Sequence, residues 1–187
     1  MGNRSFSRER KFVIDMLKQF DLSREETNAG VIVYSLDPKL VIKLNEFYDL
    51  DEFEKALNAR SPWKKPREAY KMKVKWMNHK TRIDRALVMA KNELFTGQNG
   101  DRTGVRDVLI VLTDGRQNPP AERPLISYAQ PLLDSNVNII SVGFGKAKRE
   151  ELLKISSGPD YTLSYKGGVE VLERAVWEIL EKICNCK

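Results

Sequence analysis

Two oxygen-bearing side chains, the carboxylate of Asp114 and the hydroxyl of Thr81, are the groups in this sequence best suited to bind a cation. Asp114 follows the apolar run Val108–Leu112, and Thr81 precedes a predicted helix. Carboxylate and hydroxyl oxygens are ligands of the kind that Mg²⁺ and Ca²⁺ prefer. Each residue also has a simpler interpretation: Asp114 with Gly115 suits a turn after a strand, and Thr81 with Asp84 suits a capped helix start. The two side chains form a site only if the fold brings them together.

A parallel α/β sheet would bring both side chains to one edge. The run Val108–Leu112 is apolar without interruption, as in a strand buried on both faces. The predicted strands are Gly30–Ser35, Leu40–Leu44, Val108–Leu112, Val137–Gly143 and Tyr161–Tyr165, and the predicted helices are Ser7–Phe20, with Ser7 as N-cap, Leu50–Ala59, Ile83–Phe95, Leu125–Asp134, Arg149–Ile155 and Val169–Ile183. This alternation predicts an α/β fold with a doubly wound, mostly parallel sheet and helices on both faces. Ligands bind such sheets at the carboxyl ends of the strands.

The length of 187 residues predicts a single domain, which we place at residues 1–183. Residues 184–187 form a tail with the only two cysteines, Cys184 and Cys186. These are either two thiols on a frayed end or partners in disulfides at the boundary to a following domain. The longest apolar runs are much shorter than the roughly 20 residues that cross a bilayer. The first residues lack the apolar segment of a signal peptide.

The net charge of +6 is concentrated in residues 60–82, which hold nine basic residues and one acid. Part of this segment, Lys71–Trp76, alternates lysine with apolar residues, as in an edge strand protected by lysines. The other interpretation is a surface that binds a polyanion, such as a glycosaminoglycan or an acidic protein; nucleic acid is less well supported. The residues predicted to bind the polyanion are Lys64, Lys65, Arg67, Lys71, Lys73, Lys75 and Lys80.

The sequence offers little for catalysis. His79 is the only histidine and lies in the basic segment, and the chain contains no Gly-x-x-x-x-Gly-Lys phosphate loop. Gly143-Phe144-Gly145 follows a predicted strand but lacks the third glycine of a dinucleotide-binding turn. We therefore expect a protein that is not an enzyme, and a nucleotide-linked enzyme is the least favoured alternative.

The order of these segments resembles the von Willebrand factor type A domain, from about Asn3 to Cys184. The most specific match is Leu112–Arg116, with the sequence Leu-Thr-Asp-Gly-Arg. The resemblance implies a metal-ion-dependent adhesion site in which Thr81 and Asp114 hold Mg²⁺, or Ca²⁺ or Mn²⁺ in its place. It also implies that an acidic residue of a protein ligand completes the coordination beside Gly115 and Arg116.

The sequence departs from that family in one respect. The family carries an Asp-x-Ser-x-Ser motif after its first strand, and this sequence contains no such motif. Met1–Phe6 resembles the part just after the motif, so our hypothesis is a domain truncated at its N-terminus, without its first, central strand. Since Mg²⁺ requires about six oxygens, we expect weak metal binding or none. We also expect exposed backbone groups on the two strands that would flank the absent one.

The favoured function is therefore a protein-binding adhesion module of an extracellular matrix or cell-adhesion protein, with an impaired metal site. By the same resemblance, the protein is expected outside the cell. The alternative is metal-independent polyanion binding through residues 60–82. A chelator would abolish the first activity and leave the second unchanged.

Overall fold

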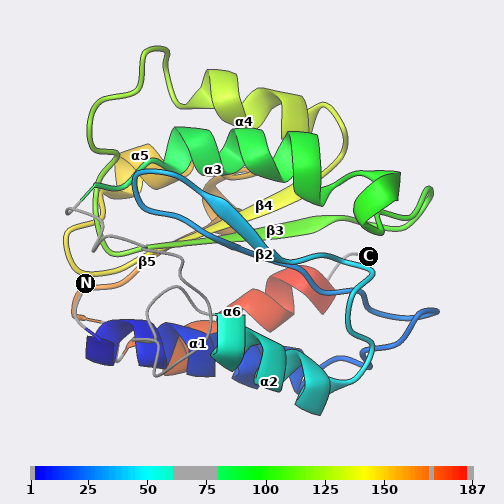
Figure 1. Ribbon diagram of the computed structural model, residues 1–187. Helices are drawn as coiled ribbons and strands as arrows, with labels where there is room; N and C mark the ends of the chain where they lie inside the picture. The colour runs from blue at the N-terminus through cyan, green and yellow to red at the C-terminus, as the bar shows by residue number, and fades with distance from the viewer. Residues whose placement is uncertain (1–2, 61–79, 169–170, 185–187) are drawn as a thin grey trace, which may run out of the picture.

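The computed structural model describes residues 3–60, 80–168 and 171–184 and has three layers (Figure 1). A central layer of strands lies between α3, α4 and α5 on one side and α1, α2 and α6 on the other. The helices are α1 (Asn3–Leu17), α2 (Leu50–Arg60), α3 (Ile83–Met89), α4 (Ile126–Leu133), α5 (Arg149–Leu153) and α6 (Leu172–Cys184). The strands are β1 (Val31–Val33), β2 (Lys39–Ile42), β3 (Val108–Thr113), β4 (Asn138–Gly143) and β5 (Thr162–Ser164). Short helical turns cover Ala90–Leu94, Gly97–Asn99 and Pro159–Tyr161.

The strands form two separate sheets in the described part of the chain. β3, β4 and β5 pair in parallel in that order, with Ile110 opposite Ile140. β1 and β2 form an antiparallel hairpin of their own, with an irregular register after Val31. Parallel neighbours need helical crossovers, and helices cover both faces of this sheet. The predicted α/β fold class is confirmed.

Alternate residues of β3 and β4 point into two apolar clusters on opposite faces of the sheet. Ile140 and Val142 of β4 pack with α1 and α6, in a cluster that includes Phe12 and Ile179. Ile139 of β4 lies on the other face, in a cluster with residues of α3 and α4. These three β4 side chains are fully buried, so β4 is the centre of the molecule's core.

The burial predicted for the run Val108–Leu112 is only partly found. Of the six residues of β3, only Val111 and Thr113 are buried, and the others are half-buried. The reason is that β3 pairs with β4 on one side and with no described strand on the other. An apolar run therefore indicates that a strand can be buried, but the neighbouring strands decide whether it is.

Both predicted helix caps are wrong. α1 begins at Asn3, so Ser7 lies inside the helix. At α3 the N-cap position is Arg82, with no capping hydrogen bond from a side chain, so Thr81 and Asp84 form no capping box. The α-helix predicted to reach Phe95 ends at Met89, and a wider π-helical turn follows over Ala90–Leu94.

Among the described helices, none is both long and apolar enough to cross a membrane.

Candidate functional site

The loops after β3 and before α3 bring Thr81 beside Gly115, the residue after Asp114. Thr81 and Asn118 exchange two backbone hydrogen bonds of 2.9 Å, which tie the two loops together. A Cβ added to Gly115 would lie 3.3 Å from the Thr81 hydroxyl oxygen, so that hydroxyl lies beside the residue directly after Asp114. The absence of a side chain at residue 115 therefore permits this close approach.

A tight turn after β3 sets the position of Asp114. The Thr113 hydroxyl donates a hydrogen bond of 3.0 Å to the Gly115 carbonyl, and the Gly115 amide donates one of 3.3 Å to that hydroxyl. The Asp114 carbonyl accepts a 2.9 Å hydrogen bond from the backbone amide of Lys146, in the loop after β4. Gly145 allows that loop to pass close to Asp114, with a φ of 63° that favours glycine. The carboxylate is thus presented by a well-supported backbone.

A buried ion pair supports the other loop. The Arg82 guanidinium donates two hydrogen bonds, of 2.8 and 2.7 Å, to the carboxylate of Asp84, which is 1% exposed. Burial alone would raise the pKa of Asp84, but hydrogen bonds from Arg82 and Gln117 outweigh burial and lower it. The Arg82 amide donates to the Ser35 carbonyl, 2.8 Å away, which joins this loop to the segment after β1. Asp84 is therefore a structural anchor, although the sequence pattern assigned it to a helix cap.

Glu9 is the carboxylate that the sequence reasoning missed. It lies on α1, close enough to Asp114 for the two negative charges to interact. Burial raises the pKa of Glu9 to about 8, and repulsion from Asp114 contributes to the rise. Its Oε1 is buried without a hydrogen-bond partner among the described residues. The available signal was periodicity: Glu9 precedes Phe12 and Val13 by three and four positions, on the apolar stripe of the helix.

Tyr34 is a second residue that the sequence did not reveal. It follows β1, and its hydroxyl donates a 2.6 Å hydrogen bond to the Leu112 carbonyl of β3. Burial raises the pKa of this hydroxyl above its ordinary value. One tyrosine side chain therefore bridges the two sheets at the carboxyl end of β3.

The described residues do not make a complete site for a divalent cation. Thr81 and Asp114 contribute one hydroxyl and one carboxylate, and Glu9 adds a carboxylate nearby. Mg²⁺ requires about six oxygens in octahedral geometry. No group of three or more acidic, histidine or cysteine side chains in the described ranges is arranged to hold a metal ion. The donor set therefore does not fit a tightly held cation.

The remaining predicted site residues lie in two places. Gly115 is half-buried, and Arg116 is exposed at the same edge of the sheet. Lys80 is exposed directly before Thr81. The other predicted polyanion-binding residues lie outside the described residues: Lys64, Lys65, Arg67, Lys71, Lys73 and Lys75. Polyanion binding therefore stays a prediction from the sequence, as does the pairing of Cys184 and Cys186.

The sequence is similar to segments of several long proteins. It is 26% identical over 185 residues to von Willebrand factor A domain-containing protein 2 of Xenopus laevis, covering 99% of this chain and 21% of that protein. It is 25% identical to collagen alpha-4(VI) chain of Mus musculus (97% of this chain, 7% of that one). It is also 25% identical to matrilin-1 of Gallus gallus (98% and 35%). The chain thus spans about a third or less of each of these relatives.

Solved structures share the fold, and the family model extends over most of the chain. Proximal thread matrix protein 1 from the mussel byssus superposes with a TM-score of 0.81 at 21% identity, covering 98% of this chain and 43% of that one. A further structure of the mussel protein is described as having a zinc-occupied MIDAS motif. The family model of the von Willebrand factor type A domain matches residues 1–168. The chain therefore belongs to the von Willebrand factor type A domain family.

Proposed function

We propose that this chain is a protein-binding module of an extracellular matrix or cell-adhesion protein. Its family membership and its similarity to collagen VI chains and a matrilin support this function. The proposed binding surface is the carboxyl edge of the sheet around Thr81, Asp114, Gly115 and Arg116. The observation that carries the proposal is that the Thr81 hydroxyl lies beside Gly115, the residue that follows Asp114.

The chemistry of this surface favours an acidic ligand. Arg116, Lys80 and Lys146 are all exposed near the Asp114 turn, and the Thr81 hydroxyl is a neutral donor beside them. A guanidinium group can bind a carboxylate through two parallel hydrogen bonds, which gives orientation as well as affinity. A protein that presents an aspartate or glutamate on an exposed loop would therefore be recognised by direct charge pairing.

We further propose that a divalent cation contributes little to this binding. Thr81 and Asp114 are the residues that would hold the ion, which would supply an electrophilic position for the ligand's carboxylate. Calorimetric titration of the full chain with Mg²⁺ is expected to give a dissociation constant in the millimolar range or no signal. Binding in the submicromolar range would contradict the proposal that the site is impaired.

The function is tested by saturable binding of the purified chain to an immobilised preparation of extracellular matrix proteins. Arg116→Ala is expected to weaken binding roughly tenfold, because it removes a charge-assisted hydrogen bond. Lys55→Ala, an exposed charge change on α2, is the matched control and is expected to have no effect. Equal binding by the two variants would show that the surface around Arg116 does not bind the ligand. A chelator is expected to change the affinity by less than about twofold, because the cation contributes little to the binding free energy.

A further inference from the structure

The loops at the carboxyl edge of the sheet carry a set of exposed cations, which we call the basic end. Backbone hydrogen bonds tie these loops together. The Lys146 amide donates one of 2.9 Å to the Asp114 carbonyl, and the Gly145 amide donates one of 2.7 Å to residue 167. Among residues 114–118, 144–150 and 164–168, the exposed acid is Glu150. The basic end consists of Lys80, Arg116, Lys146, Lys148, Arg149 and Lys166.

The loops at the opposite edge carry exposed charges of the other sign. Residues 21–26, which we call the acidic loop, lie beside the start of α2, because the Arg24 guanidinium lies 4.7 Å from the centre of the Tyr48 ring. Arg24 and Arg106 are exposed cations at this edge, and the exposed acids outnumber them. These acids are Asp21, Glu25, Glu26, Asp49, Asp51 and Glu52.

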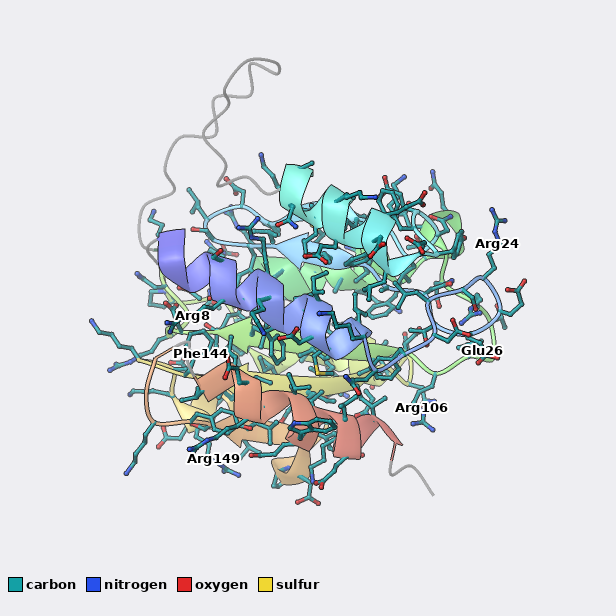
Figure 2. The ribbon with its side chains drawn as sticks, turned by 90° about the horizontal axis from the view of Figure 1, so that it is seen from below. Arg8, Arg24, Glu26, Arg106, Phe144 and Arg149 are labelled. Atoms are coloured by element: carbon teal, nitrogen blue, oxygen red, sulfur yellow. The ribbon has the colours of Figure 1, made fainter. Side chains whose placement is uncertain are left out.

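The basic end and the acidic loop lie at opposite ends of the molecule. Figure 2 shows one end marked by Arg8, Phe144 and Arg149, and the other marked by Arg24, Glu26 and Arg106. The six residues of β3 alone span about 20 Å between the two edges, at roughly 3.3 Å per residue. Two surfaces this far apart cannot meet within one molecule, so their opposite charges can pair only between molecules.

The acidic loop has the form of a ligand for the basic end. The Arg102 guanidinium donates hydrogen bonds to three successive carbonyls, those of residues 24–26, two of them at 2.7 and 2.8 Å. The Glu26 amide donates a 3.0 Å hydrogen bond to the Ser23 hydroxyl. The backbone of the loop is therefore held in place, while the Glu25 and Glu26 side chains are exposed. A loop that is already ordered loses little conformational freedom when it binds.

We propose that the basic end of one copy of this chain binds the acidic loop of a second copy, head to tail. This inference rests on the proposed function, because it names an acidic ligand for the same edge of the sheet. Arg116 and Arg149 can each hold a carboxylate through two parallel hydrogen bonds. Because the two surfaces differ, each contact leaves one free surface of either kind, and further copies can join in a row.

The composition of both surfaces favours this occupant. The large apolar side chains that are exposed in the described residues all lie outside the basic end and the acidic loop. A partner of the basic end must therefore bind through charge, without an apolar anchor, and the acidic loop does so. Exposed ion pairs are individually weak and are screened by salt. The association is therefore expected to be weak and to depend strongly on ionic strength.

Sedimentation velocity of the full chain tests the association. In low salt, the sedimentation coefficient is expected to rise with chain concentration up to about 1 mM, a range that suits weak binding. In about 1 M salt, where the screening length falls to about 3 Å, the chain is expected to sediment as a monomer at every concentration. Association that persists in 1 M salt would contradict a contact made by charge pairs.

Two double variants, each without one of the surfaces, test the head-to-tail geometry. Lys148→Glu with Lys166→Glu reverses part of the basic end, and Glu25→Lys with Glu26→Lys reverses the acidic loop. Each alone is expected to self-associate at least roughly tenfold more weakly than the wild type. An equimolar mixture is expected to form dimers that grow no further, because each pair joins one intact basic end to one intact acidic loop. Circular dichroism establishes that both variants fold.

The two variants also control for net charge. The first lowers the chain's net charge of +6, and the second raises it. A change in overall repulsion would therefore strengthen the association of one variant and weaken that of the other. Weaker association of both is expected only if each variant removes a specific surface.

The inference is overturned if the wild type stays monomeric in low salt, if either variant associates as the wild type does, or if the mixture stays monomeric. Heparin binding that the basic-end variant loses, without self-association of the wild type, would also overturn it, because a polysaccharide would then be the occupant. Binding to matrix proteins without self-association overturns this inference and leaves the proposed function standing. Self-association that the mixture restores, without binding to matrix proteins, supports this inference and removes the proposed matrix ligand.

Discussion

β3 and β4 are adjacent strands with similar apolar sequences, yet they differ in burial along most of their length. Ile139, Ile140 and Val142 of β4 have no exposed surface, whereas four of the six residues of β3 are half-buried. Among the described residues, β4 pairs with a strand on each side, whereas β3 pairs with a strand on one side only. The comparison shows that a strand's burial depends on its neighbours as much as on its own sequence.

The matched residues Ile140 and Ile110 offer the most direct way to break this comparison. They are register partners on the same face of the sheet. Ile140→Ala is expected to lower the free energy of unfolding by about 2–5 kcal/mol, since the site is fully buried. Ile110→Ala is expected to cost about half as much, because its side chain is only half-buried. Urea denaturation measures both, and equal losses would show that β3 is as well packed as β4.

Hydrogen exchange on the free chain tests the two edges of β3 separately. The amides of Leu109 and Val111 point toward β4, and those of Ile110 and Leu112 point away from it, to the edge that pairs with no described strand. We expect the second pair to exchange at least roughly tenfold faster, corresponding to about 1.4 kcal/mol less protection. Uniform protection along the strand would mean that the edge of β3 opposite β4 is also paired in solution.

Removal of the hydrogen bond that joins the two sheets should have a smaller effect. Tyr34→Phe deletes the hydroxyl that bonds to Leu112 and is expected to cost about 1 kcal/mol of stability. Thermal unfolding measures the change, and Tyr161→Phe, on the far side of β4, is the control for loss of a tyrosine hydroxyl. An unchanged midpoint for Tyr34→Phe would show that water satisfies the Leu112 carbonyl equally well.

The smallest effect is a pH dependence at the amino end of β3. Burial, followed by repulsion from Asp101, raises the pKa of Asp107 from 3.8 to about 6. The folded chain therefore holds this proton more tightly than the unfolded chain, so its contribution to stability is greatest below pH 4 and is lost as the pH rises through 6. Asp107→Asn is expected to stabilise the chain at pH 7 by less than about 1 kcal/mol, because solvent screens this partly exposed group.

The comparison for Asp107→Asn is made by urea denaturation at both pH values. At pH 4 the variant and the wild type are expected to have nearly the same stability. Asp160→Asn changes an exposed carboxylate at the other edge of the sheet and controls for net charge. A stabilisation of Asp107→Asn that is equal at pH 4 and pH 7 would contradict the assignment to this proton.

The sequence placed Thr81 and Asp114 in loops beside a helix and a strand because both residues adjoin elements with clear local signals. The apolar run before Asp114 indicated a strand, and the stripe after Thr81 indicated a helix. The partners of Asp84 could not be anticipated in the same way. Its ion pair with Arg82 depends on the path of the loop, and local pattern favoured a cap in its place.

By itself, the sequence determined the alternation of helices and strands, the fold class and the loop that carries Asp114. These follow from periodicity and turn residues, which act over a few positions along the chain. Only the tertiary structure decided that one edge of β3 pairs with no described strand, that Glu9 is buried close to Asp114, and that Tyr34 bridges the two sheets. Each of these depends on which distant segments lie side by side, because backbone pairing and burial are properties of neighbours in space.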